Sequence, residues 1–232
     1  MRQAYNVGNF GIVPSFGGAS REFDGVNDKI DLPSGYLELQ GDDAVSFSVW
    51  IWLTNKDHNG EGYIGNWDGA QGWFLQMSNQ NATFNIASSW ANGHLRAVSD
   101  SLFPNYENWA HIAITYDGSE SENGFNFYIN GTPATSLRVK FGGAPSTISY
   151  TLDPIIGYRF NAFHYTGKLA DFRYYTKELS NADVATIYGG SHVPDGLSGW
   201  WLTDADDVLD YSGSGNHGTN DGSVFSTDGP LD

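Results

Sequence analysis

Hydrophobic and polar residues alternate along several stretches of the chain, the period of two that is typical of a β-strand with one buried face. The longest such stretch covers residues 45–53. Its second face mixes serine with tryptophan, so we expect partial cover on that side as well. One face holds Phe47, Val49, Ile51 and Leu53, and the other holds Ser46, Ser48, Trp50 and Trp52.

Residues 109–116 and 125–129 repeat this alternation. The first of these strands should stop at Asp117 and Gly118. The second leads into Asn130 and Gly131, a dipeptide that readily forms a hairpin turn because both residues tolerate a positive φ angle. The sequence therefore predicts a β-hairpin at Asn130 and Gly131.

Only residues 180–188 have a helical pattern, with Ser180 placed to cap the helix, Asp183 in its first turn, and two glycines after its end. Because the predicted strands follow one another without intervening helices, we expect an all-β fold, a two-sheet antiparallel jelly-roll sandwich with one short surface helix. Residues 20–232 would form this sandwich. Residues 1–19 would form an arm whose apolar side chains dock on the sandwich or on another subunit.

Six motifs follow one another between residues 20 and 190: FDGVNDKI (23–30), SFSVW (46–50), WAHIAITYDG (109–118), FYING (127–131), GKLADFRYY (167–175) and ELS (178–180). In this order they resemble the motifs of bacterial and phage laminin-G-like domains, which belong to the concanavalin A-like lectin/glucanase superfamily. The resemblance implies a lectin-like jelly roll. It also implies that Trp50, Trp109, Trp200 and Trp201 lie in the core.

A further match, GWWL (199–202) followed by DYSGSGNHGT (210–219), resembles the segment that commonly opens such domains, yet here it comes last. The order is therefore similar to a circular permutation, which predicts that the C-terminal segment folds back beside the first strand. The chain departs from the family at Ala170, where an acidic residue is usual, and at Asn130, where aspartate is usual.

The chain carries 27 acidic and only 11 basic residues, for a net charge of -16. This charge disfavours nucleic acid as a partner. The chain has no cysteine, which excludes disulfides and thiolate metal sites. We expect no membrane span, because no run approaches about 20 apolar residues, and the first residues lead into no apolar stretch of the kind a secretory signal needs.

Carboxylate-rich loops offer the hard oxygen ligands that Ca²⁺ prefers. If the permuted segment folds back, two aspartates of the first strand could join two of the C-terminal loops around a structural Ca²⁺. The alternative is that these residues only form turns and keep the protein soluble. The candidate metal ligands are Asp24, Asp28, Asp207 and Asp210.

Exposed aromatic rings can stack on the C–H faces of sugars, with neighbouring polar groups bonding the hydroxyls. Two segments of the sequence, 66–73 and 89–92, fit this description. The alternative is that these rings pack in the core. The candidate ligand-binding residues are Trp52, Trp67, Asp68, Trp73, Trp90 and Asn92.

Signals of catalysis are missing from the sequence. Related sandwich hydrolases carry Glu-x-Asp-x-x-Glu on one strand, which this chain lacks, and Glu120 and Glu122 fall in a polar turn. The histidines form no spaced metal set, and no Gly-x-Ser-x-Gly motif is present. We therefore expect no enzymatic activity.

Three functions remain in view. The first is a structural or binding protein on the surface of a phage virion, in its capsid decoration or tail, that contacts itself or other virion proteins through residues 1–19 as a homo-oligomer. The second is a secreted or cell-surface adhesin module that binds glycan. The third is a glycan hydrolase or lyase. The first is favoured because a virion protein assembles without a secretory signal, and the first two are compatible.

Overall fold

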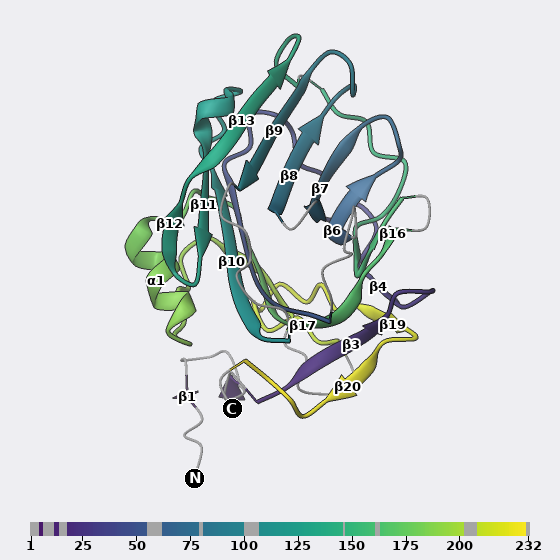
Figure 1. Ribbon diagram of the computed structural model, residues 1–232, viewed down its shortest axis with the longest axis vertical. Coiled ribbons are helices and arrows are strands. Elements are labelled where there is room, and N and C mark those ends of the chain that lie inside the picture. Colours follow the sequence, from purple (N-terminus) through teal and green to yellow (C-terminus); the bar gives the residue numbers. More distant parts are fainter. Residues whose placement is uncertain are drawn as a thin grey trace.

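The chain folds into two antiparallel β-sheets packed face to face (Figure 1). Each sheet has eight strands among the residues that the computed structural model describes. The described residues are 5–6, 12–13, 18–54, 62–78, 81–99, 107–145, 147–160, 163–201 and 208–230. The all-β sandwich predicted from the alternation is confirmed.

The first sheet is centred on β5, which pairs with β10 on one side and β17 on the other. The predicted strand over residues 45–53 has the expected bounds. The strand order is β12-β11-β10-β5-β17-β3-β20, with β18 also paired to β17. The strands are β3 (Ser20–Asp24), β5 (Val45–Leu53), β10 (Trp109–Tyr116), β11 (Phe125–Ile129), β12 (Thr132–Ala134), β17 (Thr166–Tyr175), β18 (Leu197–Trp201) and β20 (Val224–Ser226).

The second sheet has the order β13-β9-β8-β7-β6-β14-β4-β19. Two short antiparallel ribbons and one turn of 3-10 helix, Glu122–Gly124, lie outside both sheets. The strands of the sheet are β4 (Lys29–Asp31), β6 (Gly62–Trp67), β7 (Gly72–Ser78), β8 (Asn81–Ala87), β9 (His94–Ser99), β13 (Ser136–Phe141), β14 (Ile155–Ile156) and β19 (Thr219–Asp221), and the ribbons pair β1 (Tyr5–Asn6) with β2 (Ile12–Val13) and β15 (Tyr158–Arg159) with β16 (Phe163–His164).

Aromatic rings fill the space between the sheets. Phe47 of β5 stacks on Trp73 of the opposite sheet, with ring centroids 4.8 Å apart, and on its own neighbour Tyr174 at 5.3 Å. Trp201 stacks on Phe172 at 5.5 Å. Burial of these large apolar surfaces is the main source of stability in such a sandwich.

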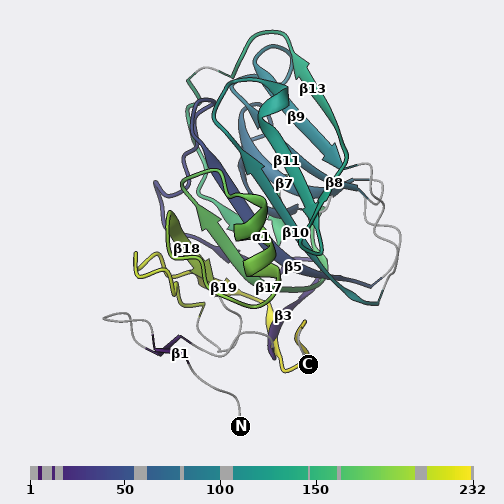
Figure 2. The ribbon, with the colours of Figure 1, turned by 90° about the vertical axis from the view of Figure 1, so that its left-hand side faces the viewer.

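The outer face of the first sheet is covered by helix α1 (Asn181–Tyr188), which lies across the strands in Figure 2. Ser180 caps the helix, and its hydroxyl accepts a hydrogen bond from the N–H of Asp183 while the Asp183 carboxylate accepts one from the N–H of Ser180. Trp50 stacks on Tyr188 at 5.4 Å. The predicted helix and the predicted cover over the tryptophan side of β5 are both confirmed.

The hairpin between β11 and β12 turns at Asn130 and Gly131, as predicted, with φ angles of 48° and 73°. The Asn130 side chain also ties the hairpin to the neighbouring strand, because its Oδ1 accepts a hydrogen bond from the N–H of His111. Asparagine therefore serves both the turn geometry and the sheet.

The C-terminal segment completes both sheets. β18 pairs with β17, β19 pairs with β4, and β20 pairs with β3, so this segment folds back beside the first strands as its permuted motif predicts (Figure 1). The Ser20 hydroxyl donates to the carbonyl of Asp228 at 2.6 Å. The two described ends of the sandwich are therefore neighbours.

A buried ion pair lies where β17 bulges away from β5. Asp171 has a positive φ angle of 48°, and its Oδ1 accepts hydrogen bonds from Arg173 at 2.8 Å and from the indole of Trp200 at 2.6 Å. The guanidinium also lies over the Trp200 ring. A buried charge loses its hydration, so it needs a countercharge and hydrogen bonds such as these to compensate.

Most of the arm expected over residues 1–19 lies outside the described residues, so that expectation stays open. Within the described ranges, no helix is long and apolar enough to cross a membrane.

Candidate functional site

An aromatic cluster lies on the outer face of the second sheet, where strands β6, β7, β8, β9 and β13 meet their turns. We define the cluster as Trp67, Phe74, Trp90, His94 and Phe141. Trp90 is 48% exposed and stacks on His94, with centroids 4.4 Å apart, and Trp67 meets Trp90 edge-on at 5.4 Å. Phe141, which lies opposite His94 on β13, stacks on the His94 ring with centroids 5.0 Å apart. The result is an exposed indole supported by the buried rings of His94 and Trp67, with the exposed ring of Phe141 on the far side of His94.

Three turns hold Trp90 in place. Its backbone N–H donates to the carbonyl of Ala70, which joins the β8–β9 turn to the β6–β7 turn. The Asn92 side chain accepts a hydrogen bond from the N–H of Gly143, which joins the β8–β9 turn to the turn after β13. The Trp90 ring is therefore fixed by contacts from both sides before any ligand arrives.

Asp68 shapes the β6–β7 turn beside the cluster. Its Oδ1 accepts hydrogen bonds from the N–H groups of Ala70 and Gln71, and its Oδ2 accepts one from the Thr151 hydroxyl. Desolvation would raise the pKa of Asp68, but these hydrogen bonds together lower it below its usual value. Asp68 is therefore an ionised residue that holds the turn, with a carboxylate at the rim of the cluster.

His94 is the buried support of Trp90. It lies within 2.9 Å of the Asn85 side-chain oxygen through its Nε2, which therefore donates. Burial lowers the pKa of His94 to about 4, and the nearby positive charge of Arg96 acts in the same direction. At neutral pH the ring is uncharged.

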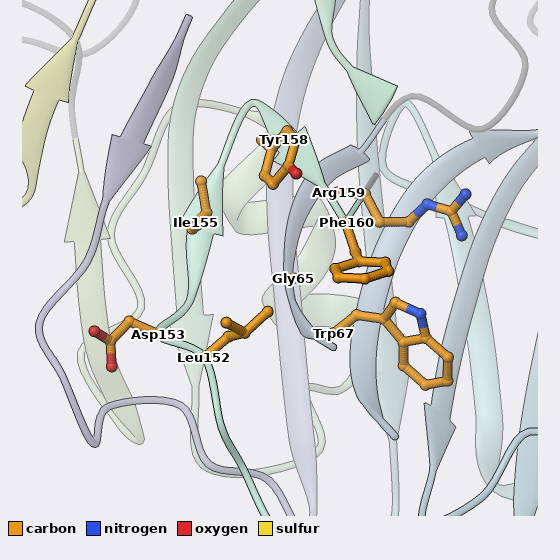
Figure 3. A pocket seen from close by; sticks show the side chains of 8 residues that line it. All are labelled: Gly65, Trp67, Leu152, Asp153, Ile155, Tyr158, Arg159 and Phe160. Carbon is orange, nitrogen blue, oxygen red and sulfur yellow. The ribbon is translucent and has the colours of Figure 1, made fainter. Parts of the chain in front are cut away.

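A small hollow opens beside Trp67 (Figure 3). Phe160 packs against Trp67 and Phe74 there, and Gly69 makes room for its ring. The hollow has a volume of about 10 Å³, which is room for roughly one water molecule. A ligand would therefore lie on the aromatic surface and not in this hollow.

Four of the six residues predicted to bind a ligand come together here: Trp67, Asp68, Trp90 and Asn92. Trp67 is only 7% exposed, so it supports the surface more than it forms it. The other two lie elsewhere. Trp73 is fully buried, and its indole N–H donates to the carbonyl of Leu37, so the prediction that it faces a ligand is wrong.

Trp52 lies on the outer face of the opposite sheet and is not part of the cluster. It meets Trp109 edge-on at 5.7 Å, and the Lys168 ammonium lies 5.6 Å from its ring centroid. The six ligand-binding residues predicted from the sequence therefore lie on two different surfaces and in the core.

The described candidate metal ligands do not form one site. Asp24 accepts hydrogen bonds from the N–H groups of Val26 and Asn27, and Asp28 accepts one from the N–H of Asp24. Asp210 accepts three, from Trp200, Ser212 and Asn216.

Most of these donors lie in the turn of the carboxylate itself, as the alternative of turn formation predicts, and the structural Ca²⁺ stays a prediction. Throughout the described ranges, no three His, Asp or Glu side chains gather as metal ligands would. Asp207 lies outside the described residues.

The alternation rule missed Phe74, His94 and Phe141 as members of the cluster. Every residue from Gly72 to Met77 is buried, so β7 shows no polar face that would reveal which side chains point outward. The strand pairing in the structure is needed to show which side chains share the outer face, with His94 opposite Phe141 and Phe74 opposite Gly65.

The fold resembles several solved structures. A candidate carbohydrate binding protein from Bacteroides ovatus superposes with a TM-score of 0.65 at 14% identity, over 91% of this chain and 60% of that one. A heptameric SAP-like pentraxin from Limulus polyphemus has a TM-score of 0.61 at 14% identity, over 92% and 97%. The binding domain of botulinum neurotoxin serotype D has a TM-score of 0.56 at 18% identity, over 81% and 46%. The chain thus spans less than two thirds of the first and third of these.

No curated protein sequence is similar enough to this chain to count as a match. The family model of the concanavalin A-like lectin/glucanases superfamily, by contrast, matches residues 24–185. This match covers most of the sandwich, and the resemblance inferred from the motifs is confirmed. The chain belongs to the concanavalin A-like lectin/glucanases superfamily.

Proposed function

We propose that this protein is a non-catalytic carbohydrate-binding module whose ligand stacks on Trp90. The exposed indole carries this proposal, because it is large, apolar and held in one orientation by His94 and by the turns around it. A ring that is already fixed loses little conformational entropy when a sugar stacks on it.

Polar groups suited to sugar hydroxyls flank the ring. Asn92 lies in the same turn and is exposed, and the ionised Asp68 lies in the adjoining turn. Amide and carboxylate groups beside an aromatic ring are the usual complement of a sugar, which has C–H faces and hydroxyl edges. The surface is open, so it suits a chain or a terminal sugar better than an enclosed small molecule.

The related structures support the same class of function. The Bacteroides ovatus protein is named for carbohydrate binding, and the botulinum domain is named for binding. A glycosidase would need two carboxylates in different environments, about 5 to 10 Å apart. Asp68 holds its turn through Oδ1, and Asp171 is buried in an ion pair on the opposite sheet, so these two carboxylates do not form such a pair.

We further propose that the module is displayed on a phage virion, which the phage-type motif series supports. In Figure 1 the β6–β7 and β8–β9 turns lie at the top, whereas β3 and β20 lie at the bottom. Anchoring through the lower end, with residues 1–19 contacting further subunits, would leave Trp90 facing outward. Antibodies against the chain should label the outside of the particles in immunogold microscopy, and particles without label would contradict this placement.

The binding proposal is tested with Trp90→Ala on a panel of polysaccharides, measured by affinity electrophoresis and isothermal titration calorimetry. The variant should keep its melting temperature within a few degrees and lose binding at least about tenfold. Trp52→Ala, which removes a partly exposed indole from the opposite sheet, is the matched control and should bind as the parent does. Equal binding by parent and Trp90→Ala, or turnover of any polysaccharide, would overturn the proposal.

A further inference from the structure

Two arginines on the outer face of the second sheet have neither a hydrogen bond nor an ion pair with the described residues. Among the described basic residues, Arg96 and Arg159 are the two for which neither a hydrogen bond nor an ion pair is present, and the Nε of each is buried without a partner. Lys29, Lys168, Lys177 and Arg173, by contrast, are each paired with a carboxylate. In a chain with a net charge of -16, two unpaired guanidinium groups on one face require an explanation.

Arg159 is held by aromatic rings. Its guanidinium carbon lies 4.9 Å from the ring centroid of Phe74 and 4.3 Å from that of Phe163. In Figure 3 it extends toward the same side as the indole of Trp67, whereas the carboxylate of Asp153 points away from it. The rings fix the orientation of the guanidinium while leaving its charge uncompensated.

Arg96 reaches the same area from the next strands. It lies opposite Asn85 on β8, and Asn85 lies opposite Phe74 on β7, so the three side chains form one row on one face. Strands are about 4.8 Å apart, which places the Cα atoms of Arg96 and Phe74 about 10 Å apart. Two arginine side chains can therefore approach one ligand above Asn85.

The row borders the aromatic surface directly. His94, which supports Trp90, is hydrogen-bonded to Asn85, and the positive charge of Arg96 helps to lower the pKa of His94. Gln76 and Thr83 form the next row on the same face. The row of Arg96, Asn85 and Phe74 is therefore continuous with the residues that support Trp90.

We infer that the carbohydrate ligand is acidic, and that Arg159 and Arg96 receive a carboxylate or sulfate group of the glycan while a neighbouring sugar ring stacks on Trp90. This inference rests on the proposed function and names its ligand class. Planar guanidinium groups bind carboxylate and sulfate with paired hydrogen bonds. Burial lowers the pKa of Arg159, but the guanidinium stays protonated at neutral pH, so it retains the charge that recognition needs.

The test compares acidic glycans with their neutral counterparts. Oligogalacturonate is paired with its carboxyl-reduced form, and a sulfated galactan with its desulfated form, and affinities are measured by calorimetry at low and high salt. The parent protein should bind at least one acidic member at least about tenfold more tightly than its neutral counterpart, and this preference should shrink as salt rises. The pair that shows the preference identifies carboxylate or sulfate as the recognised group.

Arg159→Gln and Arg96→Gln should each reduce that preference, because each removes a positive charge that would meet the acidic group of the glycan. Arg138→Gln is the matched control, because it removes the same charge from an arginine whose hydrogen bonds are with Ser136, Asn123 and Asn126. It should retain the preference.

The outcomes separate the two proposals. A parent that binds neutral and acidic forms equally, or variants that keep the preference, would overturn the acidic ligand and leave carbohydrate binding intact. A parent that binds neither form of either pair, nor any other member of the polysaccharide panel, would overturn both. If Arg159→Gln also lowers the melting temperature strongly while Arg96→Gln does not, the Arg96 variant decides the question.

Discussion

The exposed indole of Trp90 lies on the buried imidazole of His94, with the two rings inclined by 30° and their centroids 4.4 Å apart. His94 is in turn held by Asn85 on the neighbouring strand. The orientation of the exposed ring is thus set by a strand of the sheet and not by its own turn alone. This contact makes the surface sensitive to changes beneath it.

Trp67 and Trp90 should respond differently to truncation. Trp67→Ala removes a ring that is 7% exposed and packs on Phe74, so it should lower the free energy of unfolding by about 3–5 kcal/mol. Trp90→Ala should cost much less, because about half of its surface already faces water. Urea unfolding of both variants measures the difference. Equal losses would mean that Trp90 is a core residue.

Acid should weaken the fold through its buried histidines. Burial lowers the pKa of His94 to about 4 and that of His111 to about 3, from a usual 6.5. The unfolded chain therefore binds protons more readily, so the stability is fully present above about pH 6.5 and falls as the pH decreases toward 4.

This effect can be followed by urea unfolding between pH 7.5 and 4.5. His94→Gln should flatten part of the decline, because the substituted side chain does not titrate. A decline of unchanged slope in the variant would show that His94 is not responsible.

The buried pair of Asp171 and Arg173 should be costly to break. Asp171→Asn keeps the shape of the side chain but leaves the guanidinium without its countercharge, which should cost about 3–5 kcal/mol of unfolding free energy. Asp195→Asn is the control, because its pair with Lys177 is exposed and should contribute little. A similar small loss in both variants would contradict the importance of the buried pair.

A circular permutant should fold. Residues 195–230 would be placed before residues 19–194, with a short Gly-Ser linker from Pro230 to Ala19. The Ser20 hydroxyl already contacts Asp228, so the new join spans a short gap. Circular dichroism and thermal unfolding should match those of residues 19–230 in the natural order to within a few degrees. A permutant that fails to fold beside a folded control would contradict the closeness of these ends.

The strands of the first sheet could be predicted from the sequence because each has one apolar face. In β5 and β10, Phe47, Val49, Ile112 and Ile114 point to the core at every second position. The hairpin at Asn130 and the helix after Ser180 were predictable for a similar reason, since local turn and capping chemistry determines both.

The candidate site was predictable only in part. Trp67 and Trp90 were found because their segments contain aromatic, polar and glycine residues together. Trp73 was misplaced because β7 is buried on both faces and shows no alternation. Arg159 lies 85 positions from Phe74 in the sequence (159 minus 74), and no local pattern indicates that they meet.

The pairing of β3 with β20 also has a consequence for how the chain acquires its fold. Glu22 of β3 lies opposite Val224, so about 200 residues must be synthesised before this edge of the first sheet is covered. Closing so long a loop is entropically slow, and sheets built from distant contacts form late. We therefore expect the nascent chain to leave the β3 edge unpaired until residues 224–226 have been made, a period in which chaperones or assembly partners could bind it.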